Sequence, residues 1–205
     1  EINYQNNSKA SDDQVKVNVR RLDLDVTETV SFYDGKWLYY KVDVAENMDL
    51  IIDIISTRTI GSNDVFVSFG NVPTPNEFEF TGLHKNRTNQ RVLVPETKAG
   101  TYFILIKSEI SAHQHIDILA KTLPFSILSS NPETVGNGIV TTTLTGAGFR
   151  QGMEVSLYKN GSKVIDAGSV TLANSMNATI GWNLTEVEFG AYDLVLKNPG
   201  NATVT

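Results

Sequence analysis

Histidine pairs, activated serines and cysteines are the side chains from which metal sites and nucleophilic centres are built. His113 and His115 are separated by one residue, which places both rings on one face of a β-strand and matches a two-histidine metal pair. No third ligand is near in the sequence, so the alternative is a solvated strand end. The chain has no cysteine and no G-x-S-x-G segment. Thiol catalysis is therefore excluded, and no serine has a nucleophile-elbow context.

Aromatic side chains form a second set of candidate binding residues. Four of them fall out of phase with the aliphatic positions of their strand-like segments, namely Trp37, Tyr39, Phe66 and Phe103. If this face is exposed, it predicts a stacking surface for polysaccharide or collagen-like polymer. If a neighbouring domain covers it, the same pattern is packing. We expect Trp182 in the second half to lie in a core.

Composition limits the class of protein and of partner. The chain has 205 residues, of which 40% are hydrophobic and 20% charged, as is typical of globular domains. The net charge of −6 argues against nucleic acid and anionic membrane as partners, because both require basic patches. No apolar run reaches transmembrane length, so we expect no membrane insertion in this segment. We interpret the chain as a segment of a longer protein, with neighbouring domains as partners.

The elements that must position these side chains are predicted to be β-strands. Apolar residues recur with a period of two in Trp37–Val44, Met48–Ser56 and Thr101–Ser108. Asn160-Gly161 between two such stretches is a hairpin signal. No amphipathic helix of three turns is evident. The pattern predicts an all-β protein built as sandwiches.

The stretch Lys121–Pro132 divides the chain. Pro124 lacks a backbone N–H and keeps Leu123 extended, and no Gly/Ser-rich run follows. We therefore predict two consecutive β-sandwiches, residues 1–122 and 123–205, joined by a short, semi-rigid link. One continuous domain is the alternative.

The first half carries three motifs in a characteristic order. They are YYKVDV at Tyr39–Val44, NDVFVSFGNVPTPNEFE at Asn63–Glu79 and AGTYFILIKS at Ala99–Ser108, preceded by NNSKA at Asn6–Ala10. With these motifs the first half resembles the bacterial pre-peptidase C-terminal domain, whose relatives include the collagen-binding domains of clostridial collagenases. The resemblance implies a jelly-roll-like sandwich, usually non-catalytic, found beside secreted peptidases and other surface enzymes.

The second half resembles an IPT/TIG immunoglobulin-like domain. The residues that carry this resemblance are SSNPETVGNG at Ser129–Gly138, LTGAGFRQGMEVSL at Leu144–Leu157 and GAYDLVLKNPGNATVT at Gly190–Thr205. A glycine pair common in this class is replaced here by Val135-Gly136. Such domains mostly act as spacers in surface proteins. Some domains of this class bind DNA in transcription factors. The acidic charge of this chain argues against DNA binding here.

The resemblance to the collagenase relatives also implies calcium as a cofactor. Matching oxygen donors stand at Glu1, Asn6, Asn7 and Asp34. Calcium takes six to eight oxygen ligands, several of them carboxylates. Tyr4-Gln5 occupies the place where the relatives often have Glu-Pro, which removes one carboxylate. A calcium site and a plain polar linker therefore both stay open, and no other cofactor is implied.

Together these features predict a non-catalytic accessory or spacer segment of a larger protein, extracellular or at the cell surface, that presents or stabilises a neighbouring domain. The alternative is an adhesion module that binds an extracellular polymer or protein through the aromatic face of the first sandwich. The third hypothesis is a hydrolase, but no residue stands in a sequence context typical of a catalytic nucleophile.

Overall fold

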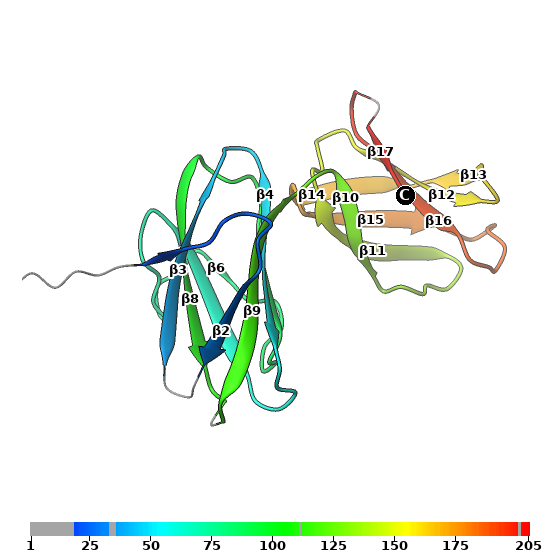
Figure 1. Ribbon diagram of the computed structural model, residues 1–205. Coiled ribbons are helices and arrows are strands. Elements are labelled where there is room, and N and C mark those ends of the chain that lie inside the picture. The colour runs from blue at the N-terminus through cyan, green and yellow to red at the C-terminus, as the bar shows by residue number, and fades with distance from the viewer. Residues whose placement is uncertain (1–18, 33–35, 111, 201) are drawn as a thin grey trace, which may run out of the picture.

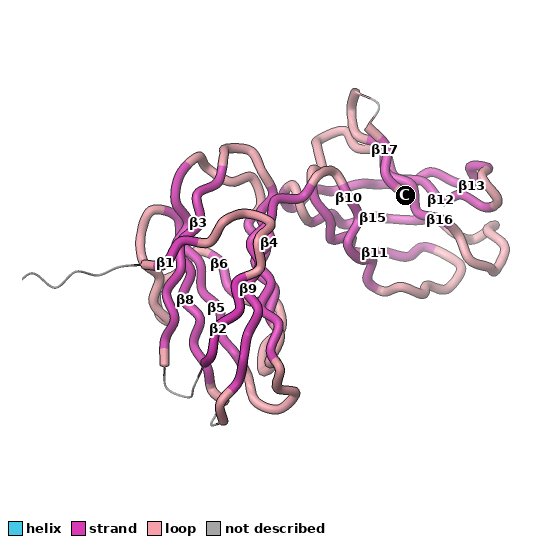
Figure 2. The backbone as a smooth tube through the Cα atoms, in the orientation of Figure 1, coloured by secondary structure: helices cyan, strands magenta, loops and turns pink. Residues whose placement is uncertain are grey.

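The structure is a computed structural model of the chain and describes residues 19–32, 36–110, 112–200 and 202–205. Strands and loops account for the described residues, without an α-helix among them (Figure 2). Consequently, no helix in this part of the chain is long and apolar enough to span a bilayer. The strands form four sheets stacked in two pairs, so the prediction of an all-β protein with two consecutive sandwiches is confirmed (Figure 1).

The first sandwich consists of a five-stranded and a four-stranded sheet. In the order of hydrogen-bonded neighbours, the five-stranded sheet contains β1 (Arg20–Arg21), β3 (Trp37–Val44), β8 (Gly100–Ser108), β5 (Asn63–Phe69) and β6 (Phe80–Thr81). The four-stranded sheet contains β2 (Glu28–Phe32), β9 (Gln114–Leu123), β4 (Asp49–Ser56) and β7 (Gln90–Val94). All pairings are antiparallel except that of β1 with β3.

The second sandwich consists of two four-stranded sheets. One contains β10 (Ser126–Asn131), β11 (Ile139–Ala147), β15 (Asn177–Asn183) and β14 (Ser169–Asn174). The other contains β13 (Ser162–Asp166), β12 (Glu154–Lys159), β16 (Asp193–Lys197) and β17 (Thr203–Val204). Two residues, Pro124 and Phe125, separate the last strand of the first sandwich from the first strand of the second.

Alternation along the strands builds the first core. In β3 the side chains of Tyr40, Val42 and Val44 are buried, while the residues between them face outward. They pack against Leu50, Ile52 and Ile54 of β4 from the opposite sheet, which are all 0% exposed. Each such aliphatic side chain contributes about 1.5–3 kcal/mol through burial, so the two facing rows hold the layers together.

The second core is smaller and is organised around Trp182. This side chain is 4% exposed and packs with Leu144, Ile180 and Leu196, as predicted. Its indole N–H donates to Thr142 Oγ1 at 3.0 Å, which satisfies the polar end of the buried ring. At the β12–β13 hairpin, Asn160 and Gly161 both have positive φ, the conformation that a two-residue type I′ turn requires.

Candidate functional site

Strand register brings the four predicted aromatic residues to one face of the first sandwich. Tyr39 of β3 lies opposite Leu105 of β8, and Leu105 lies opposite Phe66 of β5. Two residues along, Lys41 of β3 lies opposite Phe103. Since residues i and i+2 of a strand share a face, Trp37 and Phe103 lie on this outer face as well.

The four aromatic side chains differ in their exposure. Trp37 is 44% exposed, Tyr39 and Phe103 are half-buried, and Phe66 is 9% exposed. The ring of Phe66 is covered by Phe78 from the loop between β5 and β6, with 4.9 Å between the ring centroids. Trp37 is therefore the most exposed of the four rings, whereas the ring of Phe66 packs against the loop between β5 and β6. The covering role of Phe78 depends on a tertiary contact that the alternation of β5 does not encode.

A fixed positive charge lies beside Trp37. Lys107 of β8 is the register partner of Trp37 on one side and of Asp64 on the other. Its ammonium group donates to Glu109, and this hydrogen bond raises the pKa of Lys107 above its ordinary value. A ligand stacked on Trp37 would thus meet a protonated lysine held in an ion pair.

The two histidines predicted as a metal pair do lie together. The rings of His113 and His115 are 4.8 Å apart between centroids and stand edge to face. Ser31 Oγ lies 3.4 Å from His115 Nδ1. Among the described residues no cluster of three or more His, Asp or Glu side chains could hold a metal ion. Two imidazoles without a third protein ligand make an incomplete transition-metal site.

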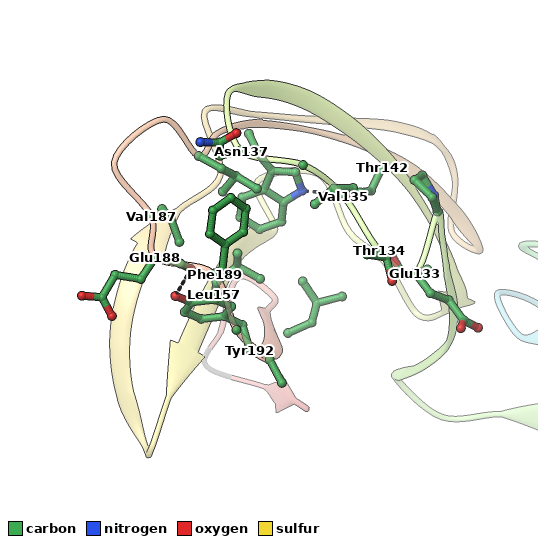
Figure 3. A pocket seen from close by; sticks show the side chains of 18 residues that line it. Glu133, Thr134, Val135, Asn137, Thr142, Leu157, Val187, Glu188, Phe189 and Tyr192 are labelled. Carbon is green, nitrogen blue, oxygen red and sulfur yellow. Dashed lines mark hydrogen bonds between the residues drawn. The ribbon is translucent and has the colours of Figure 1, made fainter.

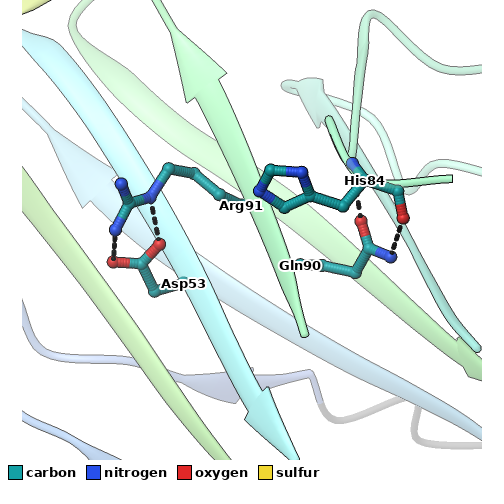
Figure 4. Close-up of polar contacts among 4 residues, drawn as sticks. All are labelled: Asp53, His84, Gln90 and Arg91. Carbon is teal, nitrogen blue, oxygen red and sulfur yellow. Dashed lines mark hydrogen bonds and ion pairs between the residues drawn. The ribbon is translucent and has the colours of Figure 1, made fainter. Parts of the chain in front are cut away.

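His84 has a structural setting. The side chain of Gln90, 5% exposed, accepts the backbone N–H of His84 at 3.3 Å and donates to its carbonyl at 2.6 Å (Figure 4). The imidazole itself belongs to an exposed loop residue. This pairing anchors the loop before β7, and it brings no second catalytic group to the ring.

The calcium prediction falls on residues outside the described part of the chain. Glu1, Asn6, Asn7 and Asp34 all lie in segments 1–18 and 33–35. Calcium binding by this set therefore stays a prediction.

A cleft of about 470 Å³ opens at the end of the second sandwich that is remote from the first (Figure 3). Its floor is the apolar side chains of Leu157, Trp182, Leu184 and Leu194. Its walls are the turn at 132–137 and the loop at 187–192, which includes Phe189, 82% exposed. The volume lies within the range of small-molecule sites, about 300–1,000 Å³.

Two polar contacts involve the loop at 187–192 beside this cleft. Tyr192 donates its hydroxyl proton to the carbonyl of Glu188 at 2.6 Å (Figure 3). The Glu188 carboxylate pairs with Lys159 at 3.5 Å. The lining includes Glu133 and Glu188 but no histidine, lysine or arginine. Among its lining residues there is therefore no nucleophile with a basic side chain beside it, and the floor of the cleft is apolar. The sequence analysis predicted the buried Trp182 but not this opening beside it.

The joint between the sandwiches contains a buried, hydrogen-bonded carboxylate. Asp49 of β4 is 5% exposed, and its carboxylate accepts the backbone N–H of Gly148 at 2.5 Å and the hydroxyl of Ser175. Both donors belong to the second sandwich. A third donor, the backbone N–H of Glu96, comes from the first sandwich at 3.0 Å. A buried carboxylate with three donors satisfies the requirement that buried charge be hydrogen-bonded.

An apolar cluster also spans the joint. Ile51 and Leu93 from the first sandwich pack with Ala147 and Met176 from the second, and Leu123 joins them from the end of β9. Ile51, Ala147 and Met176 are at most 1% exposed. The outward residues of β4, which on an isolated sheet would face water, are thus the docking surface for the second sandwich.

Asp53, another outward residue of β4, forms an ion pair on the same face of the sheet. Arg91 of β7 donates two hydrogen bonds to the carboxylate of Asp53, from Nε at 2.6 Å and from Nη2 at 3.0 Å (Figure 4). The hydrogen bond to Asp53 raises the pKa of Arg91. This bidentate ion pair links β4 to β7 beside the joint.

Comparison with solved structures finds a similarity over about half of the chain. One structural neighbour is a pre-peptidase C-terminal domain. The solved structure is that of the pre-peptidase C-terminal domain of collagenase from Bacillus anthracis, with 15% sequence identity and a TM-score of 0.43, and the match covers 53% of this chain and 100% of that domain. No protein-family model and no curated protein matches the sequence. The immunoglobulin-like assignment of residues 123–205 stays a prediction.

Proposed function

We propose that this chain is a non-catalytic accessory segment of a larger exported protein, in which residues 1–122 and 123–205 act as two sandwiches in series. The segment would hold a neighbouring domain at a set distance and orientation. The observation that carries this proposal is the joint, where Asp49 of the first sandwich accepts hydrogen bonds from Gly148 and Ser175 of the second.

Rigidity follows from the chemistry of this joint. If the sandwiches separated, the Asp49 carboxylate would lose two of its three donors, and the apolar cluster around Ile51 and Met176 would be exposed to water. The connection of Pro124 and Phe125 is too short to allow wide excursions. The apolar cluster and the buried hydrogen bonds of this interface oppose the relative motion that is otherwise expected between domains of one chain.

An extracellular location is part of the proposal. It is supported by the motif resemblance of the first half to a domain that accompanies secreted peptidases. The absence of cysteine means that stability in that environment comes from the two cores without disulfides.

Relative domain orientation tests the proposal. Residual dipolar couplings of the intact chain should fit one alignment tensor for both sandwiches. The variant Asp49→Ala should require two tensors, because it removes the acceptor shared by Gly148 and Ser175. Asp193→Asn changes an exposed strand carboxylate and serves as the control, which should keep one tensor. Two tensors for the unaltered chain would overturn the proposal.

A second candidate function is supported by the exposure of Trp37. With Tyr39 and Phe103 beside it on the outer face, this ring offers a stacking site for an extracellular polymer. Retention on insoluble collagen, cellulose, chitin or peptidoglycan, lost in Trp37→Ala, would support this function. Phe189→Ala removes a still more exposed ring from the other sandwich and is the control. Retention on none of these polymers would eliminate it.

A further inference from the structure

The two sheets of the second sandwich differ sharply in charge. The strands β10, β11, β15 and β14 contain no Asp, Glu, Lys or Arg. The opposite sheet carries charged residues of both signs on its three longer strands, namely Glu154, Lys159, Lys163, Asp166, Asp193 and Lys197. The two sheets come from the same short stretch of chain, so composition alone does not account for the segregation of charge to one of them.

The uncharged sheet presents aligned hydroxyl groups to solvent. Thr143 of β11 lies opposite Thr179 of β15, which lies opposite Thr171 of β14. On the other side Thr143 lies opposite Asn131 of β10, so one row crosses all four strands. Thr141 and Thr145 flank this row on β11, and we name these six residues the hydroxyl face. Strand geometry spaces the polar groups by about 4.8 Å across the strands and about 6.8 Å along them.

The polar groups of this row are available to a partner. Asn131, Thr143, Thr171 and Thr179 are exposed, and the core residues of these strands point to the other side. Within the part of the chain that the structure describes, the side chains of this row make no hydrogen bond. On the flank, Thr145 Oγ1 lies 3.4 Å from Asn177 Oδ1. Donors and acceptors of the central row are therefore left to solvent or to a ligand.

The chemistry of the hydroxyl face excludes several classes of partner. Nucleic acid and anionic membrane require lysine and arginine, which these strands lack. A stable protein interface is centred on aromatic, aliphatic or arginine side chains, whereas this row consists of threonine and asparagine. Without carboxylates or imidazoles, the face has no ligands for a metal ion. A neutral partner rich in hydroxyl groups is the class that matches.

We propose that the hydroxyl face binds a single chain of a neutral polysaccharide, laid across the strands along the row from Asn131 to Thr171. Hydroxyl and amide groups both donate and accept, so each can pair with a sugar hydroxyl in either direction. The uncharged face complements an uncharged ligand, because no ion must be stripped of water when the two meet. Methyl groups of the threonines supply apolar contact to the sugar C–H faces.

The shape of the sheet favours a flexible chain over a rigid lattice. Neighbouring strands in a sheet rotate by about 20–25°, so a row that crosses four strands follows a twisted path. A polysaccharide chain can follow such a path by rotation about its glycosidic bonds. The flat lattice of ice, which also offers regularly spaced neutral hydroxyls, would meet only part of the row.

Affinity electrophoresis of the intact chain tests this proposal. The gels contain dextran, soluble β-1,3-glucan, galactomannan or xylan, with alginate as the charged comparison. Retardation by at least one neutral polymer is expected, and it should persist from low to high salt because no charges take part. No retardation by any of the neutral polymers, or retardation by alginate alone, would overturn the proposal. Shaping of growing ice crystals without glycan retardation would reassign the face to ice.

Isosteric variants locate the binding. The double variant Thr143→Val and Thr179→Val keeps the side-chain shape and removes two hydroxyls, which should weaken binding about tenfold. Thr59→Val, at an exposed position of the first sandwich, is the control and should bind as the unaltered chain does. Retardation that is lost in Trp37→Ala but kept in the double valine variant would place the binding on the aromatic face and overturn the assignment. Undiminished binding by the double valine variant, with an unchanged melting curve, would contradict the assignment.

Discussion

Asp49 and Gly148 lie 99 positions apart in the chain, and the carboxylate of the first accepts the backbone N–H of the second at 2.5 Å. This contact lies at the joint between two sandwiches that each have a core of their own. A carboxylate that is 5% exposed loses much of its hydration on folding, so the donors that surround it determine whether the joint is stable.

The first prediction concerns the stability contributed by the joint. Asp49→Ala should lower the free energy of unfolding by about 2 kcal/mol, because the N–H groups of Gly148 and Glu96 lose their acceptor in a buried place. Urea unfolding monitored by tryptophan fluorescence measures it, since each sandwich contains one tryptophan. Asp193→Asn should leave the midpoint unchanged. Equal midpoints for Asp49→Ala and the unaltered chain would show that the joint adds no stability.

The second prediction concerns Gly148 itself. Its φ is +70°, and an added Cβ would lie 3.0 Å from the Cα of Phe125. Gly148→Ala should therefore destabilise the chain through both backbone strain and a backbone clash. Gly70 has φ +73° with nothing within 4 Å of the added Cβ, so Gly70→Ala reports strain alone. The difference between the two variants in thermal unfolding should be about 1–2 kcal/mol. Equal losses of stability in the two variants would mean that Phe125 moves away from the added Cβ at no cost in free energy.

The third prediction compares two ion pairs. The coupling between Asp53 and Arg91, measured by a double-mutant cycle to alanine, should be about 1 kcal/mol because the contact is bidentate and partly buried. The pair of Arg21 with Asp43 has a single contact of 3.4 Å between exposed side chains, and its coupling should stay below about 0.5 kcal/mol. Arg91→Lys should lose most of the larger coupling. A coupling that is the same for both pairs would contradict the role of geometry.

The fourth prediction concerns pH. The pKa of Asp166 is lowered, first by the hydrogen bond from the Ser156 hydroxyl at 2.7 Å and then by that from Lys163. Because the folded pKa lies below the unfolded value, the resulting stability is present above the unfolded pKa and is lost as the pH falls through the folded pKa. Ser156→Ala should raise the pKa of Asp166 in a carboxyl-carbon NMR titration. Lys163→Gln should raise it less, and the reverse order would contradict the assignment of causes.

Local sequence pattern was sufficient for much of the fold. The alternation of Tyr40, Val42 and Val44 with outward residues marked β3, because one face of a sandwich strand must be buried. Asn160-Gly161 marked a hairpin because few residues accept positive φ at both turn positions.

Contacts between distant segments could not be predicted in the same way. Phe66 was placed on the correct face, yet only the packing of Phe78 from a loop determines that its ring is covered. The cleft beside Trp182 depends on how two loops from different parts of the chain approach one another.

By itself the sequence determined which residues point inward, where the chain turns and that no thiol chemistry is available, because these properties depend on composition and on neighbours one or two positions away. Only the tertiary structure decided that Asp49 holds the second sandwich and that Asn131, Thr143, Thr179 and Thr171 form one row. The physical reason is strand register: a shift by one residue would turn these side chains to the opposite face, and register is set by the packing of whole sheets.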